Sequence, residues 1–266
     1  MKDYTFSAAK TKSDAGSLKG PSVNLLPGFS KILIIICGIG LVVLVFIQIP
    51  SFLVSPVRSS GVRGNEILTE ERIIEQLNID KEHSWIGLDP FQLSLNLKKN
   101  PWVDKAIVHR SFPLKLDVRI TERQPIAYLK TRDRLFLMAK GYRVLETMPS
   151  AKVWNLPVIV NLDLQKIEVG DMVEGAAMKK AVELIDILAD NKVLPLDAVS
   201  EIIVTNPFNI ELITIPYGIK IKLGFQNFEK KLAKLNHVLP KIEWQRQNIK
   251  YLDLRTVQGV VMKKRG

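Results

Sequence analysis

Cysteine is almost absent from this chain of 266 residues, which contains only Cys37. One thiol cannot form an intrachain disulfide, and it cannot supply the cysteines of a zinc site. Histidine is also scarce, because His83, His109 and His237 are the only three and lie far apart in the sequence. No paired carboxylates, glycine-rich phosphate loop or metal-ligand spacing is found. The sequence therefore predicts no catalytic residue, no metal and no cofactor.

Charge is missing from one long stretch, since no charged residue occurs between Lys31 and Arg58. Within it, the 18 residues from Ile32 to Ile49 are almost continuously apolar, and Pro50 follows. As a helix they would be about 27 Å long, close to the roughly 30 Å of a bilayer's hydrocarbon core. A cleaved signal peptide is the alternative, but its apolar region is about 7 to 15 residues long and ends in a small-residue cleavage site. We predict a transmembrane helix over residues 32–50.

Positive charge is plentiful elsewhere, with 38 Lys and Arg against 27 Asp and Glu and a net charge of +11. Residues 1–31 carry a net +3 among serine, glycine, threonine and proline, which predicts a disordered basic tail. The positive-inside rule places this tail in the cytoplasm and the larger C-terminal part outside. The outer part keeps a net +8. Because this positive charge is expected outside the cytoplasm, nucleic acid is not expected as a partner. Contact with an anionic cell-wall polymer remains open.

The first outer segment, residues 57–125, combines strand and helix patterns. Strict alternation of apolar and polar residues from Leu114 to Thr121 predicts a half-buried strand, joined to an earlier extended segment at residues 111–113. Thr69 can cap a short helix that buries Ile73, Ile74 and Leu77 on one face. Residues 91–97 are ambiguous, because they alternate like a strand but follow the helix-start signal Asp89-Pro90.

The remaining residues predict a second unit of short strands and two amphipathic helices. The first helix contains Ala177, Ala181 and Leu188 on one face, and the second begins after Asn227 as its expected N-cap. The expected strands cover residues 127–130, 134–139, 158–160, 201–205, 210–215, 219–223, 249–256 and 260–263.

Several motifs occur together in a fixed order. They include residues 100–113 (NPWVDKAIVHRSFP), residues 121–127 (TERQPIA), residues 141–145 (GYRVL) and residues 251–255 (YLDLR). With these motifs, residues 57–262 closely resemble the bacterial cell-division proteins of the FtsQ/DivIB family.

The resemblance implies an α+β protein with an N-terminal transmembrane helix, a small β-α-α-β-β POTRA domain and a mostly antiparallel β domain with flanking helices. The implied boundaries are a cytoplasmic tail at 1–31, the transmembrane helix at 32–50, the POTRA domain at 57–125, the β domain at 126–262 and a basic C-terminal tail at 263–266. It also implies that residues 91–99 form a helix. Proteins of this family are single-pass proteins of the cytoplasmic membrane, with their C-terminal domains in the periplasm at the division septum.

The resemblance further implies that the protein is not an enzyme but a scaffold that binds FtsB, FtsL and other division proteins and helps to assemble and regulate septal peptidoglycan synthesis. In the family, FtsB pairs with the last strand, and strand addition uses backbone groups rather than a side-chain code. Lysines near the C-terminus could pair with acidic partner residues. The alternative is that these residues only close the sheet. The expected partner-binding residues are Leu254, Arg255, Thr256, Val257, Gly259, Val260, Val261, Met262 and Lys264.

Two other functions remain open at the level of the sequence. One is a different POTRA-containing membrane-anchored scaffold, such as a component of secretion or outer-membrane assembly. The other is a membrane-anchored cell-wall hydrolase or binding module that uses the net +8 of the outer part to hold anionic polymers.

Overall fold

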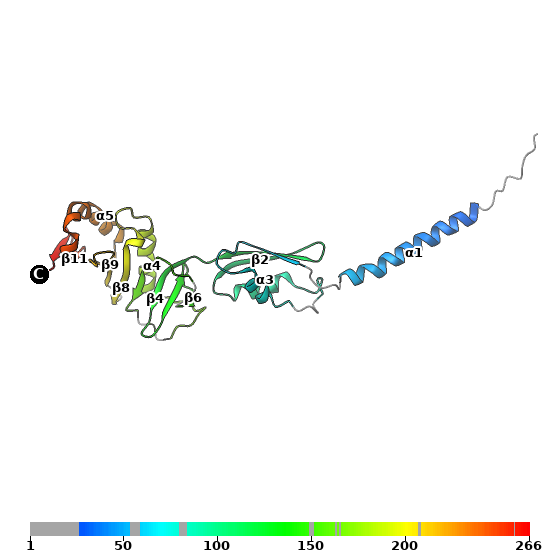
Figure 1. Cartoon of the computed structure of the whole chain (residues 1–266), viewed down its shortest axis with the longest axis horizontal. Helices are drawn as coiled ribbons and strands as arrows, with labels where there is room; N and C mark the ends of the chain where they lie inside the picture. Colours follow the sequence, from blue (N-terminus) through cyan, green and yellow to red (C-terminus); the bar gives the residue numbers. More distant parts are fainter. Residues whose placement is uncertain are drawn as a thin grey trace, which may run out of the picture. The chain divides into compact units, whose positions relative to one another are not determined.

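A computed structural model describes residues 27–53, 59–79, 84–148, 152–162, 164, 166–206, 209–257 and 259–266 (Figure 1). The chain divides into two compact units, Met1–Leu53 and Val54–Gly266. The hydrophobic clusters of the described residues contain no residue before Val62, so the second unit has its own cores.

In the first unit, the described residues form helix α1, Pro27–Leu53. The expected basic tail lies outside the described residues up to position 26, and its last five residues are helical rather than disordered. The helix also continues beyond Pro50, where the sequence suggested its end. Apolar side chains from Ile32 to Val45 are exposed along it. No helix within the described residues meets the combined length and hydropathy expected of a membrane span.

The second unit begins with a β-α-α-β-β arrangement, as predicted. Its elements are β1 (Ser59–Arg63), α2 (Glu70–Leu77), α3 (Pro90–Lys98), β2 (Val103–Ser111) and β3 (Lys115–Glu122). The three strands form a sheet in the order β1-β3-β2, in which β1 is parallel and β2 antiparallel to β3. Both helices pack on this sheet through buried leucine and isoleucine side chains.

Local capping explains the starts of the two helices. The Thr69 hydroxyl accepts a hydrogen bond from the Arg72 amide at 3.4 Å, and the Asp89 carboxylate accepts one from the Phe91 amide at 2.9 Å. The expectation that Ile74 shares the buried face of α2 is wrong, because its side chain is 38% exposed while Ile73 is buried. A helix of two turns buries too narrow a stripe to include it.

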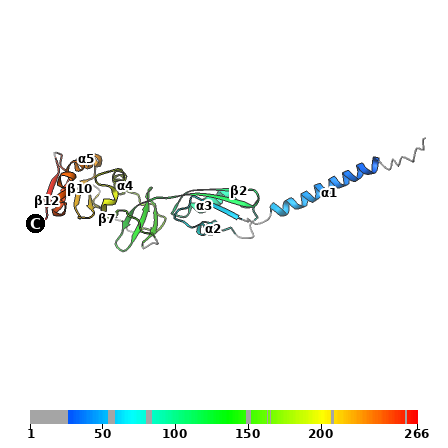
Figure 2. The same ribbon diagram turned by 45° about the horizontal axis from the view of Figure 1, so that its top comes forward.

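The rest of the second unit is one nine-stranded sheet with helices. Its helices are α4 (Ala176–Ala189) and α5 (Phe228–Val238), with short 3-10 segments η1 (Leu196–Ala198) and η2 (Leu239–Asn248). The strands are β4 (Pro125–Lys130), β5 (Leu135–Ala139), β6 (Val144–Thr147), β7 (Val158–Val160), β8 (Val199–Asn206), β9 (Asn209–Thr214), β10 (Lys220–Gly224), β11 (Ile249–Asp253) and β12 (Val261–Lys264). They lie in the order β12-β11-β10-β9-β8-β7-β4-β5-β6, and among the described residues only β10/β11, β7/β8 and β4/β7 pair in parallel. Figure 2 shows β12, β10 and β7 following one another in this order.

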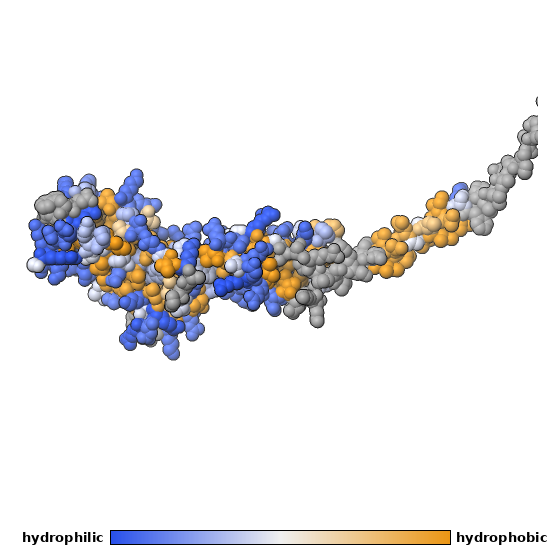
Figure 3. Space-filling model, in the orientation of Figure 1, coloured by the Kyte–Doolittle hydropathy of each residue, from blue (hydrophilic) through white to orange (hydrophobic). Residues whose placement is uncertain are grey.

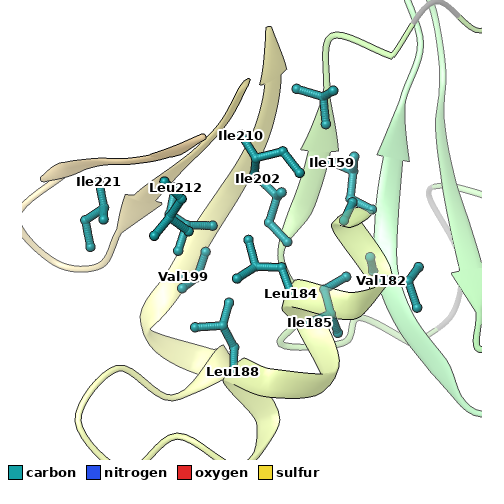
Figure 4. Packing of buried hydrophobic residues seen from close by; sticks show 14 of the residues in the cluster. Ile159, Val182, Leu184, Ile185, Leu188, Val199, Ile202, Ile210, Leu212 and Ile221 are labelled. Carbon is teal, nitrogen blue, oxygen red and sulfur yellow. The ribbon is translucent and has the colours of Figure 1, made fainter. Parts of the chain in front are cut away.

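The core of this sheet lies beneath α4. Figure 4 shows Leu184, Ile185 and Leu188 of α4 facing Ile202 and Leu212 of the central strands. Each fully buried Leu or Ile side chain contributes about 1.5 to 3 kcal/mol of transfer free energy, so this contact holds the helix on the sheet. Asn227 precedes α5 as predicted but does not cap it, because its backbone is left-handed and its side chain makes no capping hydrogen bond.

Candidate functional site

The nine-stranded sheet ends at β12, whose only strand neighbour among the described residues is β11. All four residues of β12 are exposed, and the side chains of Val261 and Met262 are 50% and 39% accessible. An edge strand of this kind presents backbone donors and acceptors in a row, ready to pair with another extended segment.

The register identifies which backbone groups of β12 point outward. The Arg265 amide donates to the Asn248 carbonyl at 2.8 Å, and Lys264 stands opposite Ile249. Because backbone groups alternate sides along a strand, Val261 and Lys263 direct theirs toward β11. Met262 and Lys264 therefore direct their amides and carbonyls away from the sheet.

The last strand, β12, begins at Val261 and ends at Lys264, one residue later at each end than the expected strand 260–263. Only Val261, Met262 and Lys264 of the expected binding residues lie in β12. Lys263 and Lys264, expected as a C-terminal tail, belong to the strand instead. The other expected residues, Leu254, Arg255, Thr256, Val257, Gly259 and Val260, lie in the connection between β11 and β12.

Polar contacts explain why this connection turns rather than continuing the strand. The Thr256 hydroxyl donates to the Gly259 carbonyl at 2.7 Å, closing a turn. The Lys234 ammonium, on α5, donates to the Val257 carbonyl at 2.8 Å. These contacts fold the chain back so that β12 returns antiparallel to β11. The sequence carried no signal for Lys234, because its partners are backbone carbonyls.

The predicted binding residues of the connection are not equivalent. Leu254 is completely buried in the core, so its side chain is not available to a partner. Val257 is 89% exposed, whereas Val260 packs partly against the core. The connection therefore supports β12 through Leu254 and offers Val257 to solvent.

Electrostatics at the base of β12 are dominated by basic groups. The Arg255 guanidinium hydrogen-bonds the Asp253 carboxylate, which lowers the pKa of Asp253 and raises that of Arg255. Desolvation lowers the pKa of Lys231, and the neighbouring Lys234 and Arg255 lower it further. Lys222 lies over the Tyr251 ring at 4.3 Å. Asp253 is already paired with Arg255, so the charge that remains around this edge is positive. Positive charge here favours a partner with acidic side chains.

Among the residues that the structure describes, no group of three or more His, Cys, Asp or Glu side chains could hold a metal ion. What the arrangement at β12 can do is bind an extended segment.

The fold and the comparisons with known proteins define the class of protein to which this chain belongs. The description "POTRA domain, FtsQ-type" matches residues 55–123, and "Cell division protein FtsQ/DivIB, C-terminal" matches residues 127–255. These successive matches define a POTRA-containing bacterial cell-division protein. The C-terminal match ends at Arg255, before β12.

Relatives agree with this class over most of the chain. Cell division protein FtsQ of Syntrophotalea carbinolica is 28% identical over 76% of this chain and 71% of its own length. Cell division protein DivIB of Bacillus cytotoxicus is 27% identical over 88% of this chain and 87% of its own. Cell division protein DivIB of Clostridium botulinum is 27% identical over 81% of this chain and 83% of its own. The chain belongs to the FtsQ/DivIB family of cell-division proteins.

Proposed function

We propose that this protein is a non-catalytic scaffold of the division machinery that binds FtsB and FtsL and helps to assemble and regulate septal peptidoglycan synthesis. Membership of the FtsQ/DivIB family supports a role in division. The observation that carries the binding proposal is that β12 is an edge strand. It pairs with β11 on one side, and no described strand pairs with its other side. An extended segment of FtsB adds to this edge as a tenth strand.

The residues around β12 take different parts in this interaction. Met262 and Lys264 supply the outward backbone groups, and Val261 packs beside the added strand. Lys264 and Arg265 attract acidic side chains of the partner, which raises the association rate more than the final affinity. The charge of Arg255 is offset by its ion pair with Asp253. Thr256, Val257 and Gly259 border the start of the edge, and Leu254 holds the connection in the core.

We further propose that residues 32–50 anchor the chain in the cytoplasmic membrane, with the N-terminal tail in the cytoplasm and the second unit in the periplasm at the septum. Support comes from the uncharged stretch between Lys31 and Arg58 and from the exposed apolar side chains of α1, which Figure 3 colours as hydrophobic. A carbonate wash of membranes containing the full chain tests this anchor, since a peripheral protein would be released.

The strand-addition proposal is tested with residues 54–266 and the outer segments of FtsB and FtsL. Met262→Pro removes the outward amide of β12 but leaves its pairing to β11, whereas Met262→Ala removes the same side chain and keeps the amide. We expect Met262→Pro to weaken FtsB binding at least about tenfold. Met262→Ala should weaken it only slightly. Binding is measured by isothermal titration calorimetry.

Circular dichroism and the denaturation midpoint check that both variants remain folded. Equal binding by Met262→Pro and Met262→Ala would exclude backbone pairing at β12. Deleting β12 is a poorer test, because it would also uncover β11 and the core residues beneath it. If the folded fragment fails to bind either partner, the scaffold proposal fails at this surface, and sedimentation with cell-wall polymer then tests the basic outer charge.

A further inference from the structure

The end of the first sheet that bears the β2–β3 turn carries an unusual group of exposed apolar and basic side chains. Phe112, in the turn, is 76% exposed, and Ile86, in the preceding loop, is 50% exposed. Arg110 and Lys115 flank them and are also exposed. We call Trp85, Ile86, Arg110, Phe112 and Lys115 the turn cluster.

Several contacts hold the turn cluster together as one surface. The Trp85 indole donates to the Lys115 carbonyl at 3.0 Å. The Arg110 guanidinium donates to the Ile86 carbonyl at 3.0 Å and lies 5.8 Å from the centre of the Trp85 ring. These contacts fix the loop of Ile86 against the end of the hairpin. The exposed side chains therefore project from an ordered platform.

The chain direction places this platform at a particular end of the sheet. In the parallel pairing of β1 with β3, Ser59 stands opposite Lys115. The start of β1 thus lies at the same end as the turn cluster. Only residues 54–58 separate Ser59 from the last residue of α1, Leu53. Even a fully extended connection of this length covers no more than about 20 Å.

A third exposed apolar residue lies toward the same end. α3 runs antiparallel to β2, because the Ser94 hydroxyl accepts a hydrogen bond from the Val108 amide and α3 leads directly into the start of β2. The first turn of α3 is therefore nearest the end of β2, and it carries Phe91, which is 66% exposed.

We propose that the turn cluster rests on the surface of a bilayer that contains anionic lipid. This inference builds on the proposed membrane anchor at residues 32–50, which would hold the start of β1 within reach of the lipid headgroups. Aromatic rings with lysine and arginine are the side chains favoured at the bilayer interface. The cations of Arg110 and Lys115 complement anionic headgroups, each strengthening binding about fivefold. Such a contact would orient the second unit on the membrane.

The deciding experiment is vesicle flotation of residues 54–266, which contain both cores but lack α1. We expect the fragment to float with vesicles of phosphatidylcholine and phosphatidylglycerol more than with phosphatidylcholine alone, and expect added salt to reduce this difference. Phe112→Ser should reduce binding to the mixed vesicles about tenfold. Lys115→Gln should reduce it about fivefold while leaving the carbonyl that binds Trp85 in place.

Ile107 provides a matched control for Ile86. Both side chains are 50% exposed, but Ile107 lies in the middle of β2, about 13 Å along the strand from its end. Ile86→Ser should weaken binding severalfold and Ile107→Ser should leave it unchanged. Equal losses, or no preference of the wild-type fragment for anionic vesicles, would overturn the proposal.

The full chain separates the failure of the anchor from that of the turn cluster. With Cys37→Ser as background, an environment-sensitive dye is attached at Ile86→Cys or at Ile107→Cys in chains reconstituted into the mixed vesicles. Lipid-borne quenchers should reduce only the signal at position 86. If the full chain is released by carbonate, the anchor fails, and fragment flotation still decides the turn cluster on its own.

Discussion

Arg255 donates two side-chain hydrogen bonds to Asp253, from Nε to Oδ1 at 2.9 Å and from Nη2 to Oδ2 at 2.6 Å. The Arg255 amide also donates to Oδ1 at 3.0 Å. Asp253 is the last residue of β11, and Arg255 lies in the connection to β12. This pair therefore fixes the direction in which the chain leaves β11, at the base of the proposed binding edge.

Asp253→Asn should destabilise the second unit by about 1 kcal/mol. The amide keeps one acceptor but loses the charge and the two-point contact with the guanidinium. The loss stays modest because the Arg255 side chain is 46% exposed and water screens the pair. Urea denaturation of residues 54–266 measures it, with Asp190→Asn, an exposed position at the end of α4, as the control. A loss no larger than that of the control would show that the pair is not stabilising.

The same pair predicts a pH dependence. The hydrogen bond from Arg255 lowers the pKa of Asp253 in the folded protein. Because the pKa is lowered, the stabilisation by this pair is fully present above the pKa of an aspartate in the unfolded chain, about 3.9. It is lost as the pH falls through the pKa of Asp253 in the folded protein. The difference in unfolding free energy between wild type and Asp253→Asn should be constant from about pH 7 to pH 5 and shrink below about pH 4. A difference that instead disappeared between pH 7 and pH 5 would contradict this assignment.

Glu122 should be important for the stability of the POTRA domain. Its two carboxylate oxygens accept hydrogen bonds from the Ile67 and Leu68 amides, each at 2.8 Å, and so join the end of β3 to the loop before α2. Glu122→Gln replaces one acceptor by a donor and leaves an amide without its partner, which should cost about 1 to 3 kcal/mol. Glu66→Gln, in the same loop but exposed, should change the unfolding free energy by less than about 0.5 kcal/mol. Similar midpoints for the two variants in denaturation would show that Glu122 does not hold the loop.

Local signals predicted some elements correctly and misled in others for identifiable reasons. Residues 91–97 alternate like a strand, yet Leu93 and Leu97 alone are buried, four residues apart, while Phe91 and Leu95 remain exposed. The period is that of a helix, and the apparent alternation comes from two apolar residues on the exposed face. The Asp89-Pro90 start signal was the better guide.

The last strand shows what the sequence could not determine. The expected strands 249–256 and 260–263 leave a break between them but do not reveal the turn closed by Thr256 and Gly259 or the contact from Lys234, because these depend on backbone groups brought together by the fold. The order of the nine strands is hidden for the same reason, since the parallel pairs join segments distant in sequence. Only the register of β12 against β11 therefore identifies Met262 and Lys264 as the residues whose backbone groups point outward.

Gly64 and Gly141 offer a test of close backbone packing. Both have positive φ, +84° and +91°, so an alanine at either position is strained by about 1 to 2 kcal/mol. At Gly64 an added Cβ would also collide with the Ile120 carbonyl of β3, whereas at Gly141 no heavy atom lies within 4 Å. Gly64→Ala should therefore cost at least about 1 kcal/mol more than Gly141→Ala in thermal or urea unfolding. Equal costs would mean that β1 and β3 separate readily at this point.

Substitutions at Leu254 and Val257 distinguish two roles of the connection, namely support of β12 and direct contact with a partner. Leu254 is 0% exposed and Val257 is 89% exposed, although the two lie three residues apart in the same connection. Leu254→Ala leaves a cavity in the core and should cost about 2 to 5 kcal/mol of unfolding free energy. Val257→Ala should change it by less than about 0.5 kcal/mol. Denaturation gives the stability of each variant, and titration with FtsB gives its affinity. If the partner contacts the connection directly, Val257→Ala weakens FtsB binding while the stability stays unchanged. If FtsB binding falls only for Leu254→Ala, in step with stability, the connection acts solely as a support for β12, and direct recognition is confined to the strand itself.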